Sequence, residues 1–361
     1  GKAAFDANTV GVETIAIGTN ALGTANENDN DGSIAIGHNA LAVQAGTGGN
    51  QFANANIGIG HSAGVAITTG GSNLAIGYQA LQTVQTGTSN IAIGYQAMDA
   101  TATNADDNVA IGYNSMGGSW ASDCNNNVAL GNYTLDGNID GLTGTVAIGH
   151  QALTACTTGL KNTAIGYQSG QALTDDTGNT LTGYQSGQAL TDSYNTAMGS
   201  EVFYTASGAA HNAGMGYQTG YYLTTGDYNV AMGSNAMLFN QTGSNNTCLG
   251  YAAGYGATGN SFSNNTLIGA NAADAITTGS SNVIMGTNAG GALTSSNYNV
   301  LIGVTAGDAI TTGASGTTCV GYNAGSAITT GGGNTAIGHQ AMDALTPVSY
   351  THLTLPTILR V

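Results

Sequence analysis

The sequence predicts an all-β fold, a parallel β-solenoid (β-roll) of about nineteen coils, from its composition and its repeat. Glycine supplies 58 of the 361 residues and proline only 2, while charged residues make up 6%. An apolar triplet followed by glycine recurs almost from end to end, and the step between copies is most often 17 residues. Such a short period, without apolar stretches of helix length, indicates stacked coils with one repeat in each coil.

The glycine that directly follows each triplet sets the register of the repeat, and we call it the motif glycine. Positions within a coil are counted from it, so that +1 is the residue that follows. Its nineteen copies are Gly18, Gly37, Gly60, Gly77, Gly94, Gly112, Gly131, Gly149, Gly166, Gly183, Gly199, Gly216, Gly233, Gly250, Gly269, Gly286, Gly303, Gly321 and Gly338.

The repeat divides the chain into three segments. Residues 1–12 form an N-terminal lead-in, residues 13–346 form the repetitive shaft, and residues 347–361 follow no repeat position. Pro347 opens the last segment, and proline lacks the N–H that a ladder needs. The stretch PVSYTHLTLPTILRV resembles a translated sequencing-adapter tail. We therefore expect the tail to be foreign to the natural chain and to form no further coil.

One coil is expected to contain two short strands and two turns. In the copy NTAIGYQSGQALTDDTG, large and small side chains alternate from Thr163 to Tyr167, which is the period of a strand. The apolar pair Ala172-Leu173 predicts the second strand. Glycine, asparagine, aspartate and serine fill the spaces between, as they do in turns.

Asparagine precedes the apolar triplet in fifteen of the nineteen copies. Stacked coils place these side chains at a spacing of about 4.8 Å, within reach of hydrogen bonds along the column. We expect a structural ladder that fixes the turns, with a glycan-binding column as the alternative. Representative members of this ladder are Asn73, Asn90, Asn162, Asn229, Asn299 and Asn334.

The predicted strands are apolar on both faces, which bears on assembly. Alanine and glycine on one face suit the narrow interior of a coil, whereas isoleucine, valine and leucine on the other face would form an exposed stripe. Three chains around a common axis would cover that stripe, so we expect a homotrimer. Replacing Gly166 with valine is expected to destabilise the coil, because this glycine faces a narrow interior or a tight turn.

The charge balance excludes some classes of partner. The formal net charge is −16, and Lys2, Lys161 and Arg360 are the only fixed cations. Three cations cannot neutralise a run of phosphates, so no nucleic-acid partner is expected. No run of 18 apolar residues is present, so we expect no membrane span in this sequence. Cys248 and Cys319 replace alanine in the repeat and are interpreted as small buried residues.

One insertion has the spaced oxygens of a calcium loop. Glu27, Asp29 and Asp31 alternate with asparagine before Gly32, but no glutamate follows at the twelfth position. These oxygens make calcium a candidate ligand of the loop, with a long solvated loop as the alternative. No other cofactor is expected.

Two further columns contain residue types that can support chemistry. Histidine and tyrosine share position +1, as in His38 and Tyr78, which indicates a planar packing role, with metal binding on a threefold axis as the alternative. Asp274 and Asp308 share a position two coils apart, at about 9.6 Å, near the separation that inverting glycosidases use. We interpret them as solvated carboxylates and expect no enzyme activity.

The repeat resembles those of known fibrous proteins. The segment N-x-A-I-G resembles the head repeat of trimeric autotransporter adhesins, which form a left-handed parallel β-roll in a threefold bundle. The longer pattern AIGYQAGxALTTGxxN is similar to the shafts of bacteriophage and marine-virus tail fibres. The resemblance covers about residues 13–345 and implies left-handed coils, three chains and an extracellular location on a virion tail fibre or a bacterial surface.

This resemblance implies two functions, and a third ranks below them. The first is a shaft that projects a receptor-binding tip, with a cell-surface glycan or receptor bound through a distal domain. The second is an adhesin head that binds host or surface matrix through its own side walls. The third is a polysaccharide depolymerase, because some tailspike enzymes build their sites on β-helices.

Overall fold

The computed structural model describes residues 1–5, 13–24, 31–44, 54–99 and 104–344. All regular elements in these residues are β-strands of three residues. The same residues contain no helix long and apolar enough to cross a membrane. The strands are β1 (Ile15–Ile17), β2 (Ile34–Ile36), β3 (Ile57–Ile59), β4 (Leu74–Ile76), β5 (Ile91–Ile93), β6 (Val109–Ile111), β7 (Val128–Leu130), β8 (Val146–Ile148), β9 (Thr163–Ile165), β10 (Thr180–Thr182), β11 (Thr196–Met198), β12 (Ala213–Met215), β13 (Val230–Met232), β14 (Thr247–Leu249), β15 (Thr266–Ile268), β16 (Val283–Met285), β17 (Val300–Ile302), β18 (Thr318–Val320) and β19 (Thr335–Ile337).

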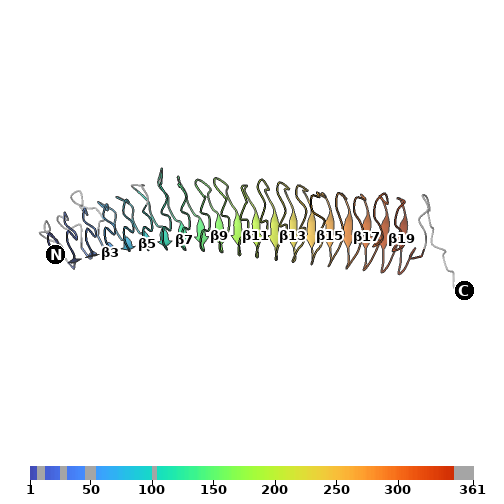
Figure 1. Cartoon of the computed structure of the whole chain (residues 1–361), viewed down its shortest axis with the longest axis horizontal. Helices are drawn as coiled ribbons and strands as arrows, with labels where there is room; N and C mark the ends of the chain where they lie inside the picture. Colours follow the sequence, from blue (N-terminus) through green and yellow to red (C-terminus); the bar gives the residue numbers. More distant parts are fainter. Residues whose placement is uncertain (6–12, 25–30, 45–53, 100–103, 345–361) are drawn as a thin grey trace. The chain divides into compact units, whose positions relative to one another are not determined.

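The chain divides into two compact units, each of which is a stack of coils (Figure 1). The first unit is Gly1–Gln185 and contains β1–β10, and the second is Ser186–Val361 and contains β11–β19. Within each unit the strands pair in chain order and in parallel. Corresponding repeat residues are partners, as in Ile91 with Val109 and Ile93 with Ile111.

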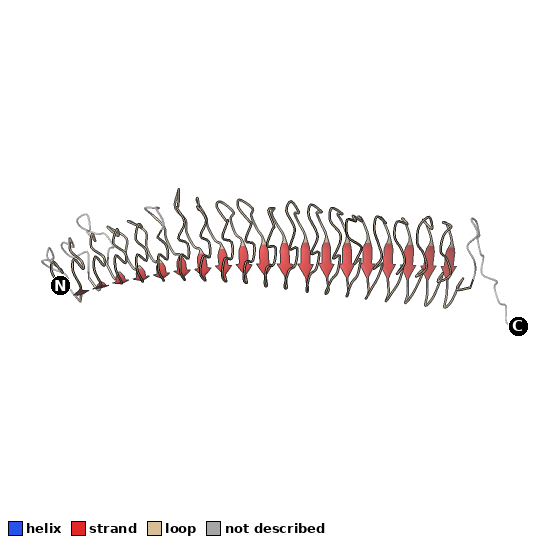
Figure 2. Cartoon of the chain, in the orientation of Figure 1, coloured by secondary structure: helices blue, strands red, loops and turns tan. Residues whose placement is uncertain are grey.

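This pairing confirms the predicted fold class, a parallel β-solenoid with coils of about 17 residues. Figure 2 shows the strands of each unit along one side of its coils, with loops and turns making up the rest. The pairing keeps its register even where a coil is longer. Ile34 and Ile57, for example, are partners although 23 residues separate them. Insertions are therefore accommodated in the loops and leave the triplets in register.

The prediction of a second strand in each coil is wrong. Beyond the triplets, strand pairing in the described residues is limited to two isolated bridges. Leu173, from the expected second strand, is fully buried but closes a turn, with its N–H donating to the Gly170 carbonyl at 3.1 Å. The backbone φ is +51° at Gln168 and +59° at Gly170. Such left-handed residues bend the chain and are incompatible with an extended strand.

The central residue of the triplet faces the interior of the coil, and in most strands it is small, as predicted. Ala164 at the centre of β9 is fully buried, whereas Thr163 is partly exposed and Ile165 is exposed. The same alternation occurs in most strands. In most triplets the larger side chains therefore lie on the outer face.

At two interior positions, +4 and +7, some coils place the bulky side chain at +4 and others place it at +7. Phe203 at +4 is accompanied by Ala206 at +7, whereas Gly64 at +4 is accompanied by Ile67 at +7, and the three apolar side chains are almost fully buried. A Cβ atom on Gly64 would lie 2.7 Å from Cδ2 of Leu41 and 2.9 Å from Cδ1 of Ile67. These coils thus hold one bulky side chain in this layer, as close packing at constant volume requires.

The repeat geometry starts before the predicted boundary at residue 13. Ala3 and Phe5 have φ of +55° and +57°, like Asn20 and Leu22 at the equivalent positions of the next coil. The Phe5 N–H donates to the Ala21 carbonyl at 2.9 Å. Within the predicted lead-in, residues 1–5 therefore have the backbone geometry and stacking contacts of a coil. The predicted tail, residues 347–361, lies outside the described residues.

Candidate functional site

The asparagines that precede the triplets form a buried ladder of hydrogen bonds. Asn229 donates from its backbone N–H and its Nδ2 to Oδ1 of Asn212, at 2.9 and 3.1 Å, and from Nδ2 to the Gly243 carbonyl at 3.0 Å. Asn246 donates to Oδ1 of Asn229 in the same way, at 3.0 and 2.9 Å. Each amide therefore ties its own coil to its neighbours.

The six representative ladder residues all occupy this kind of buried position. Nδ2 of Asn90 donates to Oδ1 of Asn73 at 3.1 Å, and Nδ2 of Asn299 donates to Oδ1 of Asn282 at 3.0 Å. Their exposed fractions range from 0 to 2% for Asn73, Asn90, Asn162, Asn229, Asn299 and Asn334. Buried amides with these partners have no surface for a ligand, so the geometry favours the structural ladder over the glycan-binding column.

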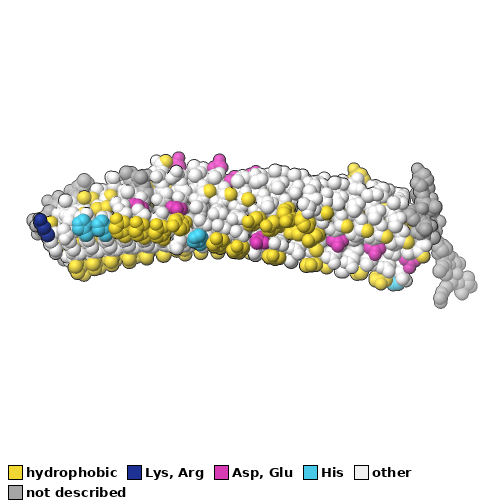
Figure 3. All heavy atoms as spheres, in the orientation of Figure 1, with side chains coloured by type: hydrophobic (Ala, Val, Ile, Leu, Met, Phe, Trp, Pro, Cys, Tyr) yellow, Lys and Arg dark blue, Asp and Glu magenta, His cyan; other side chains and the backbone are white. Residues whose placement is uncertain are grey.

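The outer face of the coils carries three columns of side chains without formal charge. The columns occupy positions −3, −1 and +1, as in Val109, Ile111 and Tyr113. Ile111 is 37% exposed and Tyr113 is 40% exposed. No coil from β1 to β19 places aspartate, glutamate, lysine or arginine at these three positions. Figure 3 shows hydrophobic side chains gathered in bands on the visible surface of the first unit.

In the first unit, position +1 forms a column of stacked rings. The ring centroids of consecutive members lie 4.9 to 5.1 Å apart from His38 through His61, Tyr78 and Tyr95 to Tyr113. The planes are nearly parallel, at 7 to 18°. Stacked rings cover one another's faces, so this column presents ring edges rather than the flat face on which a sugar ring stacks.

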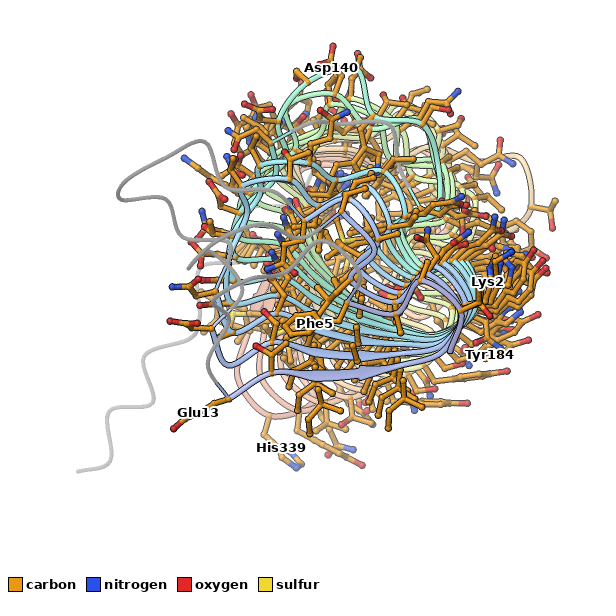
Figure 4. All side chains as sticks on the ribbon, turned by 90° about the vertical axis from the view of Figure 1, so that its left-hand side faces the viewer. Lys2, Phe5, Glu13, Asp140, Tyr184 and His339 are labelled. Atoms are coloured by element: carbon orange, nitrogen blue, oxygen red, sulfur yellow. The ribbon has the colours of Figure 1, made fainter. Side chains whose placement is uncertain are left out.

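Another part of this column is formed by His150, Tyr167 and Tyr184, with centroids 5.4 Å apart. Figure 4 shows Tyr184 projecting from the rim of the ribbon. Beside it, at position +2, Nε2 of Gln168 donates to Oε1 of Gln151, and Nε2 of Gln185 donates to Oε1 of Gln168, each at 2.9 Å. These histidines and tyrosines at +1 therefore have the planar packing role that their shared position predicts.

The second unit has aromatic contacts that the sequence reasoning missed. Tyr194, His211 and Tyr228 stack with centroids 5.2 and 4.9 Å apart, and Tyr204 stacks on Tyr221 at 4.8 Å. The signal for both is an aromatic residue that recurs at 17-residue spacing, just before the ladder position in the first case and at +5 in the second.

The predicted calcium loop is only partly covered by the structure. Glu27 and Asp29 lie outside the described residues, whereas Asp31 lies at the edge of the described part, where its backbone carbonyl accepts the Ala55 N–H at 2.9 Å. In the part of the chain that the structure describes, no three histidine, cysteine, aspartate or glutamate side chains form a group that could hold a metal ion. Calcium binding by the loop therefore stays a prediction.

The cysteines are small buried residues, as predicted for Cys248 and Cys319. Cys124, Cys156, Cys248 and Cys319 are free thiols in the coil interior. Burial raises the pKa of Cys124 to about 11 and those of Cys156 and Cys319 to about 12. Thiols with such high pKa values stay protonated and unreactive at neutral pH.

Carboxylates at position +5 are less solvated than expected. Burial raises the pKa values of Asp99 and Asp136 to about 6, and it also raises those of Asp274 and Asp308. One carboxylate oxygen of Asp308 is buried without a hydrogen-bond partner. Asp274 and Asp308, interpreted from the sequence as solvated carboxylates, are therefore partly buried at position +5.

This burial predicts that stability falls as pH rises. The pKa of Asp136 is about 6 when folded and 3.8 ordinarily. The fold thus favours the protonated carboxyl group. Its contribution to the stability of the fold is complete below the ordinary pKa and is lost as pH rises through about 6. Because solvent screens this partly exposed side chain, we expect the free energy of unfolding to fall by about 1 kcal/mol over this pH range. The thermal midpoint should fall between about pH 4 and pH 8, and Asp136→Asn should reduce that fall.

The exposed Asp175 offers a matched control. Asp175→Asn removes the same charge and should leave the pH dependence of the midpoint as in the wild type. Identical pH dependence in Asp136→Asn and wild type would show that the Asp136 carboxylate is solvated after all.

Comparison of the chain with protein-family models, with curated proteins and with solved structures finds no match in any of the three.

Proposed function

We propose that this chain is the shaft of an extracellular fibre, in which three copies pack around a common axis and project a receptor-binding tip. The observation that carries the proposal is the outer face of the strands, which is largely apolar and has no formal charge at positions −3, −1 and +1. The resemblance to tail-fibre shafts and adhesin heads supports three chains, left-handed coils and a location on a virion or a cell surface.

The distribution of charge favours contact between two copies of this chain through their outer faces. The net charge is −16, so two copies repel one another wherever their carboxylates meet. The carboxylates with raised pKa values lie at position +5, outside the three uncharged columns. Like-charged copies therefore approach most easily along the strands.

The area of this face suits a stable interface. Each coil contributes two partly exposed side chains from the ends of its triplet, such as Val109 and Ile111. If each of these side chains exposes roughly 60 Å², the nine or ten coils of one unit present on the order of 1,000 Å² of outer face. A standard stable interface buries about 800 Å² per partner.

The interior also supports a structural role. The buried asparagine ladder connects neighbouring coils by repeated hydrogen bonds. Such repetition makes stability a sum over adjacent coils, which lets a shaft grow by adding repeats.

We expect charges on the outer face to separate the copies. The double variant Ile93→Glu/Ile111→Glu places two carboxylates in the uncharged columns of neighbouring coils, where another copy would bury them at a high cost. Size-exclusion chromatography with light scattering should give three chain masses for the wild type and one for this variant.

The matched control is Gln85→Glu/Thr158→Glu, which adds the same charge at exposed positions away from the strands. It should remain a trimer, with the circular dichroism spectrum of the wild type. A wild type that is a folded monomer at micromolar concentration would overturn the trimer, and the shaft proposal would lose its main support.

An adhesin head is the second candidate, favoured by the exposed aromatic side chains on its side walls. Tyr298 is 70% exposed, and Tyr194 and Tyr228 are each 58% exposed. Surface-immobilised matrix proteins or glycans that bind the wild type, but not Tyr228→Ala/Tyr298→Ala, would support this function over a purely structural shaft.

A further inference from the structure

His38 and His61 are adjacent in the stacked column at position +1. They are the one place in the nineteen coils where histidines occupy this position in consecutive coils. Their ring centroids are 4.9 Å apart with planes at 16°, and both side chains are exposed. Two imidazoles therefore lie side by side at the surface.

Ser62 supports one of these rings. Its hydroxyl oxygen lies 3.1 Å from Nδ1 of His61, and its side chain is only 7% exposed. When Nδ1 carries the proton and donates to Ser62, the lone pair of Nε2 is free. Histidines that ligate metals have this arrangement, in which one ring nitrogen binds the ion and the other donates a hydrogen bond that fixes the tautomer.

The surroundings determine which ions suit the pair. The column continues with Thr19 on one side and Tyr78 on the other, and Lys2 occupies the same position one coil beyond Thr19. No carboxylate occupies positions −3, −1, +1 or +2 in the coils of β2, β3 and β4. Two imidazoles without carboxylates select Zn²⁺, Cu²⁺ or Ni²⁺ over the oxygen-seeking Ca²⁺ and Mg²⁺.

We propose that His38 and His61 form a two-histidine site for a borderline transition-metal ion, with water completing the coordination. At Zn–N distances of about 2.0 Å, the two ligating nitrogens must lie closer together than the ring centroids do now. The rings therefore tilt out of the parallel stack on binding, which their exposed positions allow. Both histidines belong to one chain, and position +1 is one of the three columns that the proposed trimer would bring together.

The site is tested by titrating the untagged full chain with Zn²⁺ in a calorimeter. We expect one ion per chain, and at least a tenfold loss of affinity in His61→Tyr and in His38→Tyr. Tyrosine is a conservative choice, because Tyr78 and Tyr95 already occupy this position and stack at 5.1 Å. His150→Tyr is the matched control, since His150 stacks on Tyr167 and has no histidine beside it, and its affinity should be unchanged.

Ser62→Ala tests the positioning role of the hydroxyl. We expect a loss of affinity of several-fold and a shift in the pH at which acid releases the ion, because protons and metal compete for the same lone pair. The thermal midpoint without metal should stay as in the wild type. Absence of Zn²⁺ binding, undiminished binding in His61→Tyr, or equal competition by Mg²⁺ would each overturn the site.

Discussion

Gly166→Ala is expected to lower the free energy of unfolding by about 4 kcal/mol, a large effect for one methyl group. Gly166 has φ of +141°, which side-chain-bearing residues rarely adopt. A Cβ atom here would overlap the carbonyl oxygen of Gly183 in the next coil and lie 2.6 Å from its carbonyl carbon. That neighbour is backbone in a paired ladder and cannot move aside. Denaturant titration followed by circular dichroism measures the loss.

Gly208→Ala is the matched control for this substitution. An added Cβ at Gly208 would meet only Cγ2 of Thr225, at 3.5 Å, which is an ordinary contact. Its free energy of unfolding should change by less than about 1 kcal/mol. If the two variants unfold alike, the close stacking of the motif glycines does not limit the stability of the coil.

Asn229→Ala is expected to lower the free energy of unfolding by roughly 3 kcal/mol. The truncation removes the acceptor for two donors of Asn246 and the donor to the Gly243 carbonyl, all in the interior. Buried polar groups without partners are costly, because water cannot replace the lost bonds. The same denaturant titration measures the effect.

Asn229→Thr should be better tolerated, because threonine already occupies the ladder position at Thr145. There the backbone N–H donates to Oδ1 of Asn127 at 3.0 Å, and Oγ1 donates to the Gly159 carbonyl at 3.5 Å. Equal stability of Asn229→Ala and the wild type would mean that the ladder contributes nothing beyond the backbone pairing.

The sequence predicted those features that depend on contacts between equivalent residues of adjacent coils. In a solenoid, such residues pack side by side, so the period of the sequence is also the spacing of the stack. The triplet with Ala164 buried and Ile165 outside, the column of Asn212, Asn229 and Asn246, and the stacked rings of Tyr78 and Tyr95 all follow from this correspondence.

Other features depend on backbone conformation, which the repeat pattern does not encode. Gln168 has a left-handed φ, although glutamine rarely adopts it, and Leu173 of the expected strand closes a turn on the left-handed Gly170. The sequence also placed Gly166 in a narrow interior or a tight turn, whereas the structure places its missing side chain against the backbone of the next coil.

The sequence by itself determined the period, the strand that repeats and the residues that share each column, because these are one-dimensional properties of a stacked chain. Only the tertiary structure decided which columns are buried and to what depth. Asp136 and Asp308 occupy the same repeat position, which looks solvated in the sequence, yet both side chains are partly buried. Burial depends on how the backbone curves between strands, and that curvature arises from left-handed residues that the apolar pattern does not reveal.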